Sequence, residues 1–217
     1  MSGPVLCFGD SLTAGYYGVW PHPVTSPHRS LEEADPDSVK YHPYATRLGE
    51  LLREQVDAPE AHGYPGFCAH ELLPKLQNHL KEKPWRCCVI LAGSNDIIMA
   101  GSSVEQARDR VQALHAACKE VSVPVVVVAN LDCDAENHGC VPPGEGPVRR
   151  SRLKQLGDAL LAAAAADGLA CCDPRPALPF PQPGDPSTAF WDDAIHLTPT
   201  GSDVLGRCVA EVLRAHL

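Results

Sequence analysis

The sequence predicts a single three-layer α/β/α domain, in which five parallel strands form a sheet between two layers of helices. Strand-like and helix-like segments alternate along nearly the whole chain, the pattern that parallel sheets with helical crossovers produce. Residues 86–92 and 124–131 form apolar runs, as expected of strands buried on both faces of a sheet. The 217 residues contain no internal repeat and no linker-like boundary, and their number suits one domain.

Each predicted element has a local reason. Strands are predicted where short apolar, β-branched runs end in turn residues, and helices where apolar residues recur at helical spacing. Thr198 and Pro199 open the last helix as N-cap and first helical residue. The predicted strands are 4–8, 56–62 (a weak one), 86–92, 124–131 and 169–173. The predicted helices are 43–52, 68–83, 104–121 and 148–166, followed by the one that begins at 198.

A polar segment at about residues 17–40 interrupts this alternation. It is rich in proline and histidine and has no helical or strand period. Loops of this length in compact domains are usually functional or mobile. It leaves the sheet at the end where the first predicted strand stops, so it is either a lid over that end or a surface insertion.

Composition excludes several classes of partner. The net charge of −9 argues against nucleic acid and anionic membranes, which require a basic patch. The first residues have no basic, apolar secretion signal, and no apolar stretch is long enough to span a membrane. We therefore expect a cytoplasmic protein with reduced thiols and no inserted membrane segment. The oligomeric state is not predicted.

The ten cysteines are expected to act mainly as small buried apolar side chains. One loose group, Cys133, His138 and Cys140, has residue types that bind zinc, but no paired C-x-x-C accompanies it. We expect neither a metal nor a cofactor. The five cysteines placed in predicted strands are Cys7, Cys87, Cys88, Cys171 and Cys172.

The first candidate for chemistry is Ser11, in the turn Gly9–Gly15 directly after the first predicted strand. Open α/β sheets bind ligands at the carboxyl ends of their strands, so a serine here is placed for catalysis. The alternative is a plain strand-to-helix turn in which Ser11 is only a helix N-cap.

A serine nucleophile needs a base and a group that orients the base. Most of the ten histidines lie in polar loops or on helix surfaces, but His196 directly precedes the last helix. Asp193 stands three residues earlier, so that one tight turn brings its carboxylate to the imidazole. Together they supply the remaining two members of a catalytic triad.

Acyl transfer also requires donors for the developing oxyanion. Gly66 lets a substrate approach its backbone amide closely, and Asn95 can offer a side-chain N–H. Gly63 competes with Gly66 for this role. The G-x-S-x-G elbow of α/β-hydrolases and the glycine-rich phosphate motifs are absent from the sequence.

Four ordered blocks resemble those of the GDSL/SGNH hydrolase family, which is named for its Ser, Gly, Asn and His. The resemblance spans residues 5–201, nearly the whole chain. Each block is weak alone, and the four in order are specific. The blocks are Gly9-Asp10-Ser11-Leu12, Gly66, Gly93-Ser94-Asn95-Asp96 and Asp193-x-x-His196.

The resemblance implies a flavodoxin-like fold and ester hydrolysis through an acyl-serine intermediate. It implies that Ser11 is the nucleophile, that His196 is the base and then the acid, and that Asp193 orients it. The oxyanion hole would consist of the backbone amides of Ser11 and Gly66 with the Asn95 side chain. Asp10 and Asp96 would brace their loops by hydrogen bonds. The 17–40 segment departs from the family pattern.

We therefore expect an esterase acting on small-molecule carboxylic esters with short to medium acyl chains. The run 97–100 either lines an acyl pocket or belongs to a helix core. Alternatives within the family are a carbohydrate O-deacetylase and a lysophospholipase or thioesterase. The alternative from another class is a binding module that keeps the fold without the activity.

Overall fold

The computed structural model describes residues 3–18, 39–133, 141–180, 189–193 and 195–216. Five parallel strands form its main sheet in the order β4-β1-β5-β6-β7. Counted in chain order among themselves, these strands lie 2-1-3-4-5, the order of flavodoxin-like sheets. The predicted fold class is confirmed. The strands are β1 Pro4–Gly9, β4 Asp57–Gly63, β5 Cys87–Leu91, β6 Val125–Val128 and β7 Ala170–Cys172.

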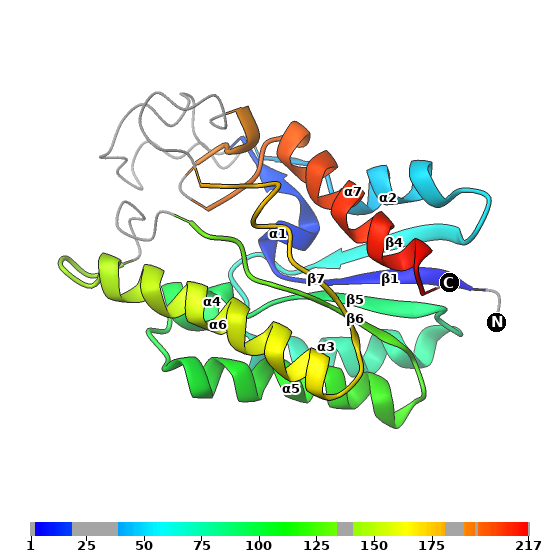
Figure 1. Ribbon diagram of the computed structural model, residues 1–217, viewed down its shortest axis with the longest axis horizontal. Helices are drawn as coiled ribbons and strands as arrows, with labels where there is room; N and C mark the ends of the chain where they lie inside the picture. Colours follow the sequence, from blue (N-terminus) through cyan, green and yellow to red (C-terminus); the bar gives the residue numbers. More distant parts are fainter. Residues whose placement is uncertain (1–2, 19–38, 134–140, 181–188, 194, 217) are drawn as a thin grey trace.

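Helices cover both faces of this sheet and complete the three layers (Figure 1). On one face α2 (Tyr44–Leu52) packs beside α7 (Pro199–Arg214). The other face carries α3 (Ala69–Glu82), α5 (Val104–Glu120) and α6 (Gly146–Ala166). Two short helices, α1 (Ser11–Ala14) and α4 (Ser94–Ile98), directly follow β1 and β5. Each therefore begins at a carboxyl end of the sheet.

The core lies where the apolar runs predicted it. Residues 5–8 of β1 and all of β5 and β6 are buried, because helices cover both sides of these strands. Of the cysteines predicted to be buried, Cys171 is the exception, since its side chain is exposed. It lies on β7, an edge strand whose outer positions face solvent.

The segment predicted as a weak strand is a full partner of β1. β4 runs over Asp57–Gly63 and pairs in parallel along the length of β1. Pro59 falls where the register shifts, since Pro4 pairs with Asp57 but Leu6 pairs with Glu60. An edge strand tolerates a proline at such an irregularity. Pairing with a central strand thus overrides the low β-propensity of this segment.

The polar segment at about 17–40 begins and ends in a short antiparallel ladder. β2 (Tyr16–Tyr17) pairs with β3 (Lys40–Tyr41), with Tyr16 opposite Tyr41. Residues 19–38 lie outside the described residues, and so does the prediction that they form a lid. The two ends of the segment are therefore fixed side by side.

One further finding concerns membranes. Over the described part of the chain, no helix combines the length and the apolar character that crossing a bilayer requires.

Candidate active site

Ser11 is the first residue of α1, at the carboxyl end of β1. Asp10 is the N-cap, because its carboxylate accepts a hydrogen bond from the Leu12 amide at 3.1 Å. The alternative in which Ser11 is the cap is therefore wrong. Along the chain, β1 is followed by β4, which lies next to β1 on one edge, and then by β5, which lies next to β1 on the other edge. Ser11 therefore lies at the topological switch point, where the strand order reverses. Doubly wound sheets bind their ligands at this point.

His196 and Asp193 approach Ser11 from the turn that precedes α7. The Nε2 atom of His196 lies 3.0 Å from Ser11 Oγ, and its Nδ1 atom lies 2.7 Å from Asp193 Oδ2. The other Asp193 oxygen accepts hydrogen bonds from the amides of Ile195 and His196, which fixes the turn. The structure thus brings the three predicted residues into one continuous chain of contacts.

For both Asp193 and His196, burial and the neighbouring charges shift the pKa in opposite directions. Burial raises the pKa of Asp193, but the charge and hydrogen bonds of His196 outweigh it and hold that pKa well below its usual range. Burial lowers the pKa of His196, but Asp193, with the charges of Asp10 and Asp192, raises it above its usual value. A histidine with both nitrogens engaged and a raised basicity is suited to accept a proton from the serine.

Of the two candidate glycines, Gly66 has the open position. Gly63 ends β4 against α1, where a Cβ atom would lie 2.1 Å from the Ala14 nitrogen. Gly66 is exposed at a φ of +82°, and a Cβ atom there would meet nothing within 4 Å. No described residue accepts a hydrogen bond from the Gly66 amide. Gly66 therefore offers a backbone donor that a substrate can reach, and Gly63 does not.

Asn95 lies in α4, after β5, and its side chain is tied to the turn that carries Gly66. Its Nδ2 atom donates to the Phe67 carbonyl at 3.0 Å. The amide has a second hydrogen, so this bond leaves one donor available. The contact links the turns after β4 and β5, which carry the two predicted oxyanion donors.

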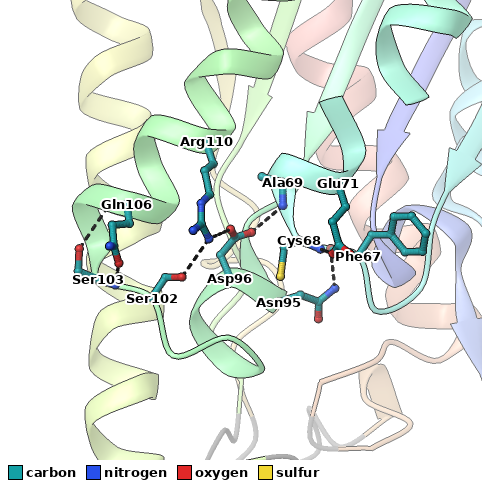
Figure 2. Close-up of polar contacts among 10 residues, drawn as sticks. All are labelled: Phe67, Cys68, Ala69, Glu71, Asn95, Asp96, Ser102, Ser103, Gln106 and Arg110. Carbon is teal, nitrogen blue, oxygen red and sulfur yellow. Dashed lines mark hydrogen bonds and ion pairs between the residues drawn. The ribbon is translucent and has the colours of Figure 1, made fainter. Parts of the chain in front are cut away.

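Asp96 makes a second link between the same turns, as Figure 2 shows. Its side chain is wholly buried, and one oxygen accepts from the Ala69 amide at 2.7 Å. The other oxygen is 2.9 Å from Arg110 Nη1, and the same Arg110 atom reaches Ser102 Oγ at 3.1 Å. Asp96 thus joins the start of α3, the start of α4 and α5.

Asp10 is buried beneath Ser11 with only part of its bonding capacity used. One oxygen accepts from the Leu12 amide, and the other has no hydrogen-bond partner among the described residues. Burial raises the pKa of Asp10 to about 6, although the Leu12 amide and the His196 charge act in the opposite direction. Asp10 is thus a buried titratable group next to Ser11, and its carboxyl group holds a proton to higher pH than an exposed aspartate does.

Potential metal ligands gather at one place in the described part of the chain. Cys68, His70 and Asp96 bring ligand atoms within 4.8 Å of one another. Both Asp96 oxygens are engaged, however, and the positive Arg110 beside them opposes a cation. We therefore assign no metal to this group. Cys133 is buried, while His138 and Cys140 lie outside the described residues.

The first half of the run 97–100 belongs to a helix core. Ile97 and Ile98 are fully buried in α4, whereas Met99 is 44% exposed. The helix-core interpretation therefore holds for the two isoleucines.

Three residues at this site were not predicted from the sequence. Asn130, buried after β6, donates to the Ala92 carbonyl at 3.0 Å and to Ser94 Oγ at 3.1 Å. A polar residue near the end of the most β-branched run was a signal for it. Tyr16 packs against His196, and Arg110 binds Asp96. No local sequence pattern predicts the Tyr16–His196 or the Arg110–Asp96 contact, because each joins residues from different elements.

Comparison with known structures agrees with this fold. Over 100% of both chains, the protein superposes on the aryl esterase of M. smegmatis with a TM-score of 0.72 and 20% identity. A lipase/acylhydrolase from Enterococcus faecalis gives 0.69 and 21%, covering 99% of this chain and 97% of that one. A GDSL-like lipase from Bacteroides thetaiotaomicron gives 0.69 and 13%, covering 99% and 89%. No curated protein matches the chain in sequence.

The sequence itself matches a family over most of its length. The model of the GDSL-like Lipase/Acylhydrolase family covers residues 7–204, which include the Ser11 turn, the Asn95 helix and the His196 turn. With the flavodoxin-like sheet and the four ordered blocks, this match is decisive: the chain belongs to the GDSL-like Lipase/Acylhydrolase family of hydrolases.

Proposed function

We propose that the protein is a serine esterase that hydrolyses carboxylic esters of short to medium acyl chains. The observation that carries the proposal is the chain of contacts from Ser11 Oγ to His196 Nε2 at 3.0 Å and from His196 Nδ1 to Asp193 at 2.7 Å. Both distances are those of a nucleophile, its base and the group that orients the base.

In the proposed reaction, His196 removes the proton of Ser11 as the serine oxygen bonds to the ester carbonyl carbon. The negative oxygen that forms is stabilised by the backbone amides of Ser11 and Gly66 and by the Asn95 side chain. His196 then gives its proton to the departing alcohol, which leaves an acyl-serine. Water, activated by the same histidine, releases the acid and restores Ser11. Asp193 keeps the imidazole in the required tautomer throughout.

A substrate panel with the variant Ser11→Ala tests this proposal. The panel contains aryl and alkyl esters of increasing acyl length, an acetylated sugar, a lysophospholipid and a thioester. We expect wild type to favour the simple esters and Ser11→Ala to lose about 10⁶-fold in kcat. A preference for the sugar, the lysophospholipid or the thioester would assign the site to another activity of the family.

A fluorophosphonate probe separates the enzyme from a binding module. We expect it to label wild type at Ser11 and to leave Ser11→Ala unlabelled. Ser151→Ala is the matched control, because Ser151 is exposed on α6. Wild type that remains unlabelled near neutral pH, or Ser11→Ala that still hydrolyses esters while folded, would contradict the proposed function.

A further inference from the structure

The ring of Tyr16 packs directly on the imidazole of His196. The two ring centroids are 4.9 Å apart, and the ring planes are inclined by 53°. Because Ser11 occupies Nε2 and Asp193 occupies Nδ1, Tyr16 is a third contact that uses the ring itself. Tyr16 belongs to β2, which lies outside the four sequence blocks.

Tyr16 is held in place from two sides. Its backbone pairs with Tyr41 of β3, and the Tyr41 ring meets the Tyr16 ring edge-on with centroids 6.0 Å apart. Two residues further along, the Gly18 amide donates to an Asp192 oxygen at 2.8 Å. Asp192 is the neighbour of Asp193, so the β2–β3 ladder is bonded to the turn that carries His196.

The charged groups that act most strongly on His196 are all carboxylates. Asp193 contacts it directly, and Asp10 and Asp192 act through space. Among the described residues, Ser11 and Tyr16 also contact the imidazole. The π electrons of an aromatic ring attract a cation that lies over the ring face within about 6 Å of its centroid. The Tyr16–His196 centroid separation of 4.9 Å lies inside this distance. The surroundings of His196 therefore favour its positively charged form.

We propose that Tyr16 is a positioning residue whose π electrons stabilise the imidazolium form of His196. This inference rests on the proposed function, in which His196 becomes an imidazolium when it takes the Ser11 proton. The proton moves from Ser11 Oγ to His196 Nε2 while the serine oxygen bonds to the acyl carbon, and it later leaves on the alcohol. Tyr16 exchanges no proton in this step; it lowers the energy of the charged intermediate.

Fluorinated phenylalanines at position 16 test the π interaction without changing the shape of the ring. Phe, 4-fluoro-, 3,5-difluoro- and 3,4,5-trifluorophenylalanine remove π-electron density in steps. We expect Tyr16→Phe to keep the titration midpoint of His196 and the fluorinated series to lower it progressively, by about 0.5 pH unit in total. The midpoint is read by NMR of labelled histidine, with His196→Ala to assign the signal.

Kinetics supply the second measurement. Activity is expected above the His196 midpoint and lost as pH falls through it, because the base must be unprotonated. The acid limb of kcat/KM should therefore move to lower pH in the same steps as the NMR midpoint. The same substitutions at Tyr17 are the control, since no ring contact joins Tyr17 to His196 in the described structure.

Two outcomes would overturn the inference: a midpoint that stays constant across the series, or an equal shift with the Tyr17 series. NMR needs no turnover, so the two proposals are tested separately. A stepwise shift in a protein that hydrolyses no ester would refute the proposed function and keep the ring interaction. A constant midpoint in an active esterase would refute only the role of Tyr16.

Discussion

At the scale of single residues, the site places buried acids around one histidine. Asp193 is kept ionised by His196, whereas Asp10 has one buried oxygen with no hydrogen-bond partner among the described residues. Burying an ionised carboxylate without enough hydrogen bonds or positive charges around it costs free energy. This cost favours the protonated form, so the pKa of the carboxyl group rises. The pKa values of Asp10 and Asp193 are thus shifted in opposite directions although both groups are buried near Ser11.

The variant Asp10→Asn should reveal this cost. Between pH 4 and 6 the folded protein keeps a proton on Asp10 that the unfolded chain has released, because the pKa rises to about 6 on folding. The Asp10 contribution to stability therefore falls as pH rises through this window. We expect the free energy of unfolding of Asp10→Asn to gain on that of wild type by up to about 3 kcal/mol from pH 4 to 7.

Urea unfolding at several pH values measures this difference. Asp57→Asn, at an exposed position at the start of β4, is the control. A difference between Asp10→Asn and wild type that stays flat or shrinks as pH rises would contradict the cost assigned to Asp10.

At the level of residues, the sequence predicted those contacts of the site that join residues close together in the chain. Asp193 and His196 share one turn, so their spacing was sufficient to pair them. Arg110 and Tyr16 could not be predicted, because their partners Asp96 and His196 come from other elements. Only the fold brings these side chains together.

At the scale of elements, the turns after β4 and β5 behave as one unit. The Asn95–Phe67 and Asp96–Ala69 hydrogen bonds join them, and Arg110 of α5 balances the buried Asp96 charge. The proposed oxyanion donors therefore depend on a helix that contributes no donor itself.

Loss of that balance should affect catalysis and stability together. Arg110→Gln leaves the Asp96 carboxylate buried with only the Ala69 amide, so we expect the free energy of unfolding to fall by about 2–3 kcal/mol. We expect kcat on the best ester to fall about tenfold with KM little changed, because the donors lose their alignment. Thermal unfolding and steady-state kinetics measure the two effects.

Arg108→Gln is the matched control on α5, since the ion pair that Arg108 makes among the described residues is with the exposed Asp109. Adding Asp96→Asn to Arg110→Gln should recover part of the stability, because no uncompensated charge remains. If Arg108→Gln lowers kcat as much as Arg110→Gln does, the effect belongs to the helix and not to the Asp96 pair.

The predicted strand at 56–62 is present but was rated too weak, because pairing overrides its local preference. Asp57–Gly63 contains a proline and few strand-forming residues, yet it pairs along β1. Its conformation is set by pairing with β1, and a pattern within the segment itself does not reveal that pairing. The apolar runs of β5 and β6 were predicted well, because burial on both faces leaves a composition that is visible in sequence.

At the scale of the whole molecule, alternation of strands and helices predicted three layers but not the order of the strands. The 2-1-3-4-5 order followed only from resemblance to the family, because several sheet orders share one alternation. This order is what puts Ser11 between the two halves of the sheet, with α2 and α7 on one face.

The packing of α2 on α7 supplies a prediction at this scale. A Cβ atom at Gly206 would lie 2.7 Å from the Tyr44 carbonyl oxygen and 3.0 Å from Arg47 Cβ. Glycine-to-alanine changes inside helices normally stabilise by up to about 1 kcal/mol. For Gly206→Ala we expect the opposite sign, a loss of about 1–3 kcal/mol in the free energy of unfolding, because the helices must separate.

Chemical denaturation of Gly206→Ala beside Arg207→Ala checks this sign. Arg207 is the exposed neighbour, where alanine meets no other helix. Stabilisation by both alanines would show that the close approach of α2 and α7 carries no cost.

The ladder of β2 and β3 has a further consequence for engineering. It holds the two ends of the intervening segment next to each other. The positions of these ends in the fold therefore do not depend on the number of residues between Tyr17 and Lys40. Loop-closure entropy grows slowly with length, by only about 0.6 kcal/mol for each doubling. This position is therefore a natural graft site, where we expect the scaffold that carries Ser11 to accept inserted segments of other lengths.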